Sequence, residues 1–232
     1  MTSPSAHVPP GRRPSEARLC TVDLFGPAGR LEAVVNEGAP DAAYCALVCH
    51  PHPLGGGTLH NKVVYHAMKT LNAPGWGFGF PVLRFNFRGA GLSDGVHHGS
   101  EEVADVLTAV NFLENEYALP VIVAGFSFGA AMALEACTKT GADVRAIAAL
   151  GLPAHAEGRT YRYPFLADLP KPKLFLSGDQ DQFATPAELE TTVRQASEPK
   201  HMVLVPGADH FFVGQLNRMQ NALAAWLKEQ VS

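Results

Sequence analysis

The sequence of 232 residues lacks a long hydrophobic run and an excess of basic charge. No segment approaches the roughly 18 consecutive apolar residues that a membrane-spanning helix needs. The net charge is −4, and neither a basic stripe nor an acidic tail is present. The sequence therefore gives no support for binding to nucleic acid or to an anionic membrane. Its composition, 47% apolar and 17% charged, is ordinary for a soluble globular enzyme.

Cysteine is also scarce, with only Cys20, Cys45, Cys49 and Cys137. They form no CxxC pair and no dense framework of the kind that disulfide-rich secreted domains have. Cys45 and Cys49 fall in an apolar run, so we expect free thiols in the core and a reducing, cytoplasmic location.

The N-terminal segment lacks the apolar stretch of a secretory signal. Residues 1–18 are rich in proline and polar residues, and we expect a disordered arm there. The remainder, residues 19–232, has the length of one domain with a sizeable core.

Strand and helix patterns alternate along this domain. Short β-prone runs cover residues 19–25, 31–36, 44–49, 81–87, 120–124, 144–150, 173–177 and 202–205. Helical periodicity or small residues cover residues 58–71, 103–113, 128–140 and 215–227, and Thr185-Pro186 opens a further helix. Ser100 is the expected N-cap of the second helix. The alternation predicts an α/β fold, with a doubly wound, mostly parallel sheet and helices on both faces.

A nucleophile motif lies between one of these strands and the following helix. Gly125-Phe126-Ser127-Phe128-Gly129 follows the run Val121-Ile122-Val123-Ala124 and opens the helix rich in alanine. In a G-x-S-x-G elbow, a sharp turn exposes the serine Oγ above the sheet, and the glycines allow close backbone approach. The strand–turn–helix setting favours Ser127 as a nucleophile over a serine that only caps a helix.

A serine needs a base, and the base needs an acid that orients it. His210 lies in a loop after the last predicted strand, whereas His201 lies at the other end of that strand and His155 precedes the expected acid. The acid is expected after the preceding strand, where Asp179 and Asp181 compete. Asp181 lies deeper in the loop and is favoured. Asp179 is then expected to make hydrogen bonds within a turn.

The loop Cys49-His50-Pro51-His52-Pro53-Leu54 and the glycines that follow it are expected to complete an oxyanion hole. One N–H would come from Phe128, the residue after the nucleophile. The other would come from His52 or, as second choice, from Leu54, because the prolines have no N–H. His50 is expected to brace the loop. His50, His52 and His60, or His97 and His98, match no standard zinc spacing, so we predict no metal site.

These motifs resemble a family. The HPHPLGGG loop, the run from Asn61 to Val64, the stretch RFNFRGAGLSDG from Arg84 and the GFSFG elbow are similar to those of small, cap-less bacterial α/β hydrolases. That group is related to dienelactone hydrolases and prolyl-oligopeptidase-like hydrolases, and the similarity covers roughly residue 19 to the C-terminus. Dienelactone hydrolases use cysteine as nucleophile, so serine here argues against their reaction. The resemblance also assigns Arg84 and Arg88 to the scaffold.

The expected function is that of a carboxylesterase for short-chain or water-soluble esters, working through Ser127, His210 and Asp181 without a cofactor. Residues 153–170 are expected to form a loop with one helical turn beside an open site. A peptidase or amidase, a thioesterase, or a non-catalytic binding protein on the same fold are the alternatives. The expected partner is a small-molecule ester, with no nucleic acid and no membrane, and the chain is expected to be a monomer or homodimer.

Overall fold

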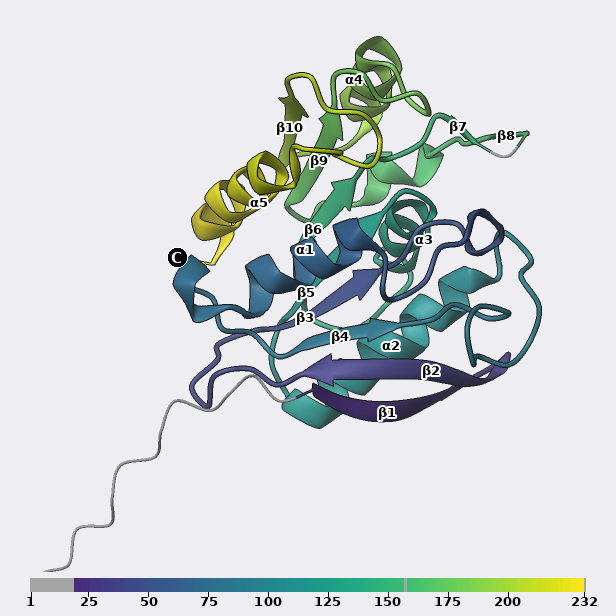
Figure 1. The fold of residues 1–232 in the computed structure, drawn as a ribbon, viewed down its shortest axis with the longest axis vertical. Helices are drawn as coiled ribbons and strands as arrows, with labels where there is room; N and C mark the ends of the chain where they lie inside the picture. The colour runs from purple at the N-terminus through teal and green to yellow at the C-terminus, as the bar shows by residue number, and fades with distance from the viewer. Residues whose placement is uncertain (1–18, 157, 232) are drawn as a thin grey trace, which may run out of the picture.

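The computed structural model describes residues 19–156 and 158–231, and the predicted arm, residues 1–18, lies outside them. An eight-stranded sheet forms the centre of the molecule (Figure 1), in the order β1-β2-β4-β3-β5-β6-β9-β10. The pairs β1–β2 and β2–β4 are antiparallel. The other strand pairs of this sheet are parallel. The predicted doubly wound, mostly parallel sheet is therefore confirmed.

The strands of the main sheet are β1 (Leu19–Gly26), β2 (Gly29–Asn36), β3 (Cys45–Cys49), β4 (Val82–Phe85), β5 (Val121–Phe126), β6 (Val144–Leu150), β9 (Lys173–Gly178) and β10 (Lys200–Val205). The helices are α1 (Lys62–Asn72), α2 (Glu102–Tyr117), α3 (Phe128–Ala136), α4 (Pro186–Gln195) and α5 (Leu216–Gln230). Short 3₁₀ helices cover η1 (Pro53–Gly55), η2 (Pro74–Trp76) and η3 (Pro164–Asp168).

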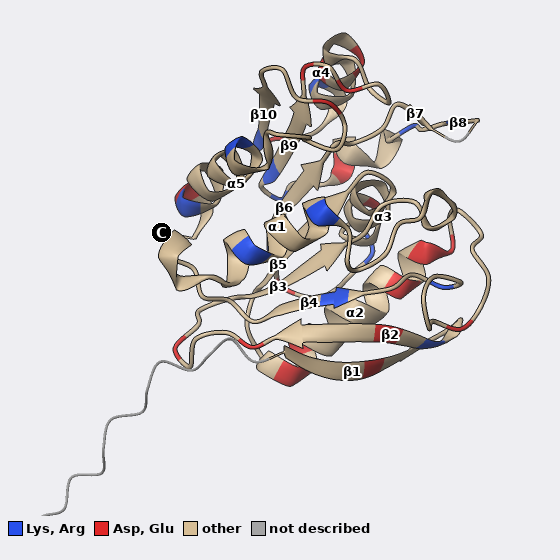
Figure 2. Ribbon diagram, in the orientation of Figure 1, with Lys and Arg blue, Asp and Glu red and all other residues tan. Residues whose placement is uncertain are grey.

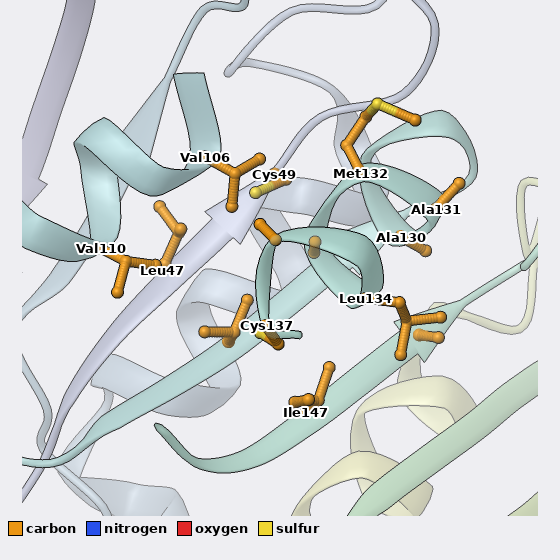
Figure 3. Close-up of a cluster of buried hydrophobic side chains, with 14 of the residues drawn as sticks. Leu47, Cys49, Val106, Val110, Ala130, Ala131, Met132, Leu134, Cys137 and Ile147 are labelled. Carbon is orange, nitrogen blue, oxygen red and sulfur yellow. The ribbon is translucent and has the colours of Figure 1, made fainter. Parts of the chain in front are cut away.

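Helices cover both faces of the sheet and bury two apolar clusters. Helices α1 and α5 pack on one face, while α2, α3 and α4 pack on the other. Figure 3 shows the second cluster, in which Ala130, Ala131 and Leu134 of α3 lie beside Leu47 and Ile147 of the strands. The small side chains let α3 approach the sheet closely, and this approach fixes the position of the turn that precedes the helix.

Three of the four cysteines are buried free thiols, as expected. Cys45, Cys49 and Cys137 are buried, and Cys20 is half-buried. Burial raises the pKa of Cys45 and that of Cys137 to about 12. Cys49 and Cys137 lie within the core cluster of Figure 3. These thiols are part of the apolar core, and they stay protonated near neutral pH.

Two helix starts differ in how well the sequence predicted them. The α4 start is confirmed, because Thr185 caps it in a capping box with Glu188, and Pro186 follows. The predicted cap Ser100 is wrong, because α2 begins at Glu102 with Glu101 as N-cap. The buried Glu102 carboxylate accepts the N–H groups of His98 and Gly99, at 2.7 and 2.9 Å. A carboxylate in the first turn of α2 thus accepts hydrogen bonds from backbone N–H groups of the segment before the helix.

The segment between β6 and β9 contains more structure than the sequence predicted. A two-stranded hairpin, β7 (His155–Ala156) and β8 (Arg159–Thr160), precedes η3. The expected helical turn is present as η3. Strands of two residues carry no readable alternation, which is why the hairpin was not predicted.

Arg84 and Arg88 belong to the scaffold, as the resemblance implied. The Arg88 guanidinium forms a buried pair with Asp105 of α2, with 2.8 Å between Nη2 and Oδ1. Arg84 donates hydrogen bonds to the Leu59 carbonyl and to Asn36, each at 3.0 Å. Both arginines are therefore engaged by the protein itself and anchor the β4 end and the loops around it.

Candidate active site

Ser127 occupies the turn between β5 and α3 in an unusual backbone conformation. Its φ is 56° and its ψ is −121°, in the half of the map that L-residues rarely adopt. The Ser127 N–H donates to the Leu150 carbonyl at 2.8 Å, which ties the turn to β6. The serine is buried, with 7% exposure. A strained serine that the surrounding structure holds in place is the geometry of a nucleophile elbow.

The two glycines of the motif are required by close packing. A Cβ at Gly129 would lie 2.4 Å from the His50 carbonyl oxygen. A Cβ at Gly125 would lie 2.4 Å from the Gly129 carbonyl oxygen. A side chain at Gly129 would push α3 away from β3, and one at Gly125 would push the start of α3 away from β5, so the two glycines fix the position of Ser127.

His210 reaches Ser127 from the loop after β10. The distance from His210 Nε2 to Ser127 Oγ is 2.9 Å. On its other side, His210 Nδ1 lies 2.8 Å from Asp181 Oδ2 and 3.0 Å from Oδ1. The structure thus brings the three residues into one hydrogen-bonded chain, in which the carboxylate fixes the Nδ1–H tautomer and leaves Nε2 free to accept a proton.

Asp181 is held as a carboxylate by three donors. Besides His210, the Ser177 hydroxyl donates to Oδ2 and the Phe183 N–H donates to Oδ1, both at 2.8 Å. Burial alone would raise the pKa of Asp181, but the hydrogen bonds and the charge of His210 outweigh it and lower the pKa below its ordinary value. Asp179 accepts instead from the Gly207 N–H at 2.8 Å and shares no hydrogen bond with His210.

Aromatic rings surround the imidazole of His210. The rings of Phe183, Phe126 and Phe211 have their centroids 4.5, 4.9 and 5.1 Å from it. Gly151 leaves the remaining space, since a Cβ there would lie 3.1 Å from His210 Cε1. His210 is only 2% exposed, so its bonds to Ser127 and Asp181 lie in a largely dehydrated environment, where electrostatic interactions are strong.

The loop after β3 lies beside the serine. His50 braces it, because its Nε2 accepts from the Phe87 N–H at 2.9 Å and its Nδ1–H donates to the Pro51 carbonyl at 2.6 Å. The His52 ring packs edge-on against Phe128, with centroids 5.1 Å apart. Phe128 is the first residue of α3, so its N–H has no partner within the helix.

Comparison with known proteins agrees with this architecture. Residues 54–230 match the model of the alpha/beta hydrolase domain family. An uncharacterised protein of Rickettsia prowazekii is 34% identical over 210 residues, which cover 87% of this chain and 86% of that protein. The chain belongs to the α/β-hydrolase family.

Two solved structures of this family are similar over most of their length. An alpha-beta serine hydrolase homologue from Coxiella burnetii has 31% identity and a TM-score of 0.78, with 88% of this chain and 95% of that chain covered. A serine hydrolase without lid from Xanthomonas campestris has 30% identity and a TM-score of 0.79, with 94% and 96% covered. The predicted cap-less α/β-hydrolase fold is thus confirmed.

A cavity of about 90 Å³ opens at the serine of this α/β hydrolase. Ser127, His210, His52 and Asn61 line it, together with Phe211. From the loop after β3, His52 lines this cavity together with Pro51, Gly55 and Gly57, whereas Leu54 does not line it and is 77% exposed. The volume suits a small group beside the reacting atoms.

Several residues of the site were not predicted from the sequence. Ser177, Gly151 and Phe183 contact Asp181 or His210, and none of the three was assigned a role from the sequence. Two of them lie close to the acid in sequence, since Ser177 ends the predicted strand before the acid loop and Phe183 follows Asp181 by two residues. Gly151, directly after β6, has a φ of 55°, which favours glycine. Its closeness to His210 follows only from the arrangement of the strands in the sheet.

Residues 19–156 and 158–231 contain no group of three or more histidine, cysteine or acidic side chains that could hold a metal ion. His97, one of the histidines considered, lies with its Nδ1 2.8 Å from Glu102 Oε1 instead. None of the helices in this described part combines the length and apolar character needed to cross a bilayer.

Proposed function

We propose that this α/β hydrolase is a serine carboxylesterase with Ser127 as nucleophile, His210 as general base and acid, and Asp181 as the orienting acid. The observation that carries the proposal is the continuous chain from Asp181 through His210 to Ser127 Oγ, with 2.8 and 2.9 Å at its two links. Serine activation requires such a base within hydrogen-bond reach.

The reaction has two balanced halves. Ser127 Oγ attacks the ester carbonyl carbon while His210 Nε2 takes its proton, and a tetrahedral oxyanion forms. The bond from carbon to the alcohol oxygen then breaks, and His210 gives the proton to that oxygen, which releases the alcohol and leaves an acyl-serine. Water repeats the sequence: His210 takes its proton, the acid is released, and Ser127 recovers its hydrogen.

Two backbone amides are proposed to stabilise the oxyanion. The Phe128 N–H lies at the start of α3, where the helix dipole also favours negative charge. The second donor is the N–H of His52, which lines the cavity at Ser127, whereas Leu54 does not. The His50 hydrogen bonds that brace the loop support this arrangement, because an oxyanion hole must be rigid before the charge develops.

The cavity size supports short acyl groups over long ones. At about 30 Å³ for each water-sized group, roughly three such groups fit in it. Initial rates on p-nitrophenyl esters from acetyl to dodecanoyl, measured for the unmodified chain and for Ser127→Ala, test the proposal. We expect kcat/KM to fall with chain length, and the Ser127→Ala variant to lose several orders of magnitude in kcat.

Labelling by a serine-directed phosphonate is the control for an intact site. Full activity in Ser127→Ala would refute the assignment of the nucleophile. Labelling without turnover of any ester would keep Ser127 as nucleophile and favour an amide, peptide or thioester substrate. Matched p-nitroanilides and thioesters would then replace the esters in the same assay.

A further inference from the structure

A second cavity of about 220 Å³ adjoins the one at Ser127. The two cavities share Asn61 and Phe211 in their walls, so they lie directly beside each other. The first cavity is too small for more than the reacting ester group and a short chain. By the same 30 Å³ measure, the second accommodates roughly seven water-sized groups, about the size of an aromatic ring. A larger substrate bound at Ser127 therefore has room in this direction.

The position of the second cavity relates it to one side of the ester. Its wall includes Phe211, Val213 and Gly214, which belong to the loop that carries His210. The Phe211 ring packs on the imidazole, with centroids 5.1 Å apart. In the proposed reaction, the alcohol oxygen must lie next to His210 Nε2 to receive its proton. The alcohol part of the ester is therefore the part that faces this cavity.

The walls of the second cavity are mainly apolar. Val63, Leu216, Phe211 and Val213 contribute to them. Phe211 is 44% and Val213 71% exposed, so two large apolar side chains face solvent at this edge of the site. An apolar ligand bound against these side chains would remove apolar surface from water, which favours binding. The chemistry of these walls suits an aryl or branched alkyl group.

Lys62 is the cation of this cavity. It is exposed at the start of α1, and its ammonium has no ion-pair or hydrogen-bond partner among the residues that the structure describes. Helix α1 carries basic but no acidic residues (Figure 2). The nearby Asp209 does not line the cavity, and its Oδ1 accepts the Val213 N–H at 2.9 Å. An anionic substituent on the bound group would thus meet an unpaired positive charge.

We propose that the second cavity binds the alcohol part of the substrate, an aryl-sized apolar leaving group, and that Lys62 favours leaving groups that carry a carboxylate. The proposal rests on the proposed esterase function. It names the substrate class as short-chain acyl esters of apolar hydroxy acids, with the carboxylate on the side away from the ester bond.

Matched acetate esters test the proposal. The acid 3-(4-acetoxyphenyl)propanoate and its primary amide release phenols of the same size and shape that differ in charge. Methyl acetate lacks the aryl group. For the unmodified chain, we expect kcat/KM to be about threefold to fivefold higher for the acid than for the amide, the upper part of the range of one exposed ion pair. High salt should reduce this preference.

Two variants separate charge from size, and each has a control. Lys62→Met should abolish the preference for the acid, whereas Lys69→Met, an exposed lysine further along α1, should keep it. Val213→Trp fills the cavity from its exposed edge. It should lower kcat/KM about tenfold for both aryl acetates and leave kcat/KM for methyl acetate within about twofold. The control is Leu92→Trp, because Leu92 lines neither cavity, and it should leave kcat/KM for all three substrates within about twofold.

The outcomes distinguish this inference from the function on which it rests. Ester turnover that depends on Ser127 but is unaffected by Val213→Trp would overturn the cavity assignment alone. An acid-to-amide ratio that stays the same in Lys62→Met would overturn the role of the lysine. Absence of turnover for every ester would overturn the proposed function, and this inference with it.

Discussion

The Ser177 hydroxyl donates a hydrogen bond to Asp181 Oδ2 at 2.8 Å, inside a fully buried pocket at the end of β9. The Phe183 N–H donates to the other carboxylate oxygen, Oδ1. Together the two donors limit the rotation of the Asp181 side chain. The acid in the loop after β9 is thus oriented by Ser177 of that strand, four residues earlier in the chain.

Ser177→Ala should therefore lower activity without removing any proposed catalytic group. A hydrogen bond to a charged group contributes about 1.5–3 kcal/mol. If that contribution supports the transition state, kcat falls roughly tenfold to a hundredfold. Ser197→Ala is the control, because its hydroxyl bonds the Leu166 and Leu169 carbonyls away from His210. Equal kcat in both variants would show that Ser177 has only a structural role.

The two aspartates of the acid loop should differ sharply in their variants. In Asp181→Asn, the amide donates where the carboxylate accepted, which favours the wrong imidazole tautomer, and loss of kcat on the order of 10⁴ is expected by analogy with other triads. In Asp179→Asn, the amide oxygen can still accept the Gly207 N–H, so kcat should stay within about twofold. Steady-state rates on p-nitrophenyl acetate make the comparison. The opposite ranking would assign the acid to Asp179.

His50 should make stability depend on pH. Burial lowers the pKa of His50 from 6.5 to about 4. Its Nε2 accepts the Phe87 N–H, so a proton on Nε2 would place two donors face to face and break this hydrogen bond. Because the unfolded chain binds the proton first, the contribution is complete above pH 6.5 and is lost as the pH falls toward 4. A shift of that size corresponds to about 3 kcal/mol in the free energy of unfolding.

Urea unfolding of matched variants measures this effect. His50→Gln keeps an acceptor near Phe87 but has no group that titrates in this range, so its free energy of unfolding should fall about 3 kcal/mol less between pH 7 and pH 4 than that of the unmodified chain. His60→Gln removes an exposed imidazole and should behave like the unmodified chain. Parallel pH curves for all three proteins would contradict the buried, neutral state of His50.

The sequence predicted those parts of the site that are encoded locally. The elbow at Ser127 is a contiguous motif between a strand and a helix, and the chain order of acid and base then pointed to Asp181 and His210, which the structure brings together. The sheet was predicted because each buried strand is a short apolar run. These features depend on neighbours in sequence, and sequence patterns report them directly.

The remaining features depend on residues that meet only after folding. Gly151 makes room for His210, which lies about sixty residues later, and no local pattern connects them. The wrong N-cap at Ser100 has a local origin instead, because the Glu102 carboxylate accepts the N–H groups of His98 and Gly99 and replaces the serine hydroxyl.

Gly129 should be among the least replaceable positions of the chain. A Cβ there would lie 2.4 Å from the His50 carbonyl oxygen and 2.7 Å from that of Cys49, both backbone atoms that cannot rotate away. Gly129→Ala must therefore displace α3 from β3, and with it the Phe128 amide and Ser127. We expect a loss of stability of about 2–4 kcal/mol and a fall in kcat of at least about tenfold.

Gly141→Ala is the matched control for that variant. It adds the same methyl group where nothing lies within 4 Å and where the backbone is outside the left-handed region. Reduced freedom of the unfolded chain should make it neutral or more stable by about 0.4–1 kcal/mol, with unchanged kcat. Thermal unfolding and p-nitrophenyl acetate rates measure both variants. If Gly129→Ala matched Gly141→Ala in both, the close contact of α3 with the His50 loop would not be what holds Ser127 in its strained turn.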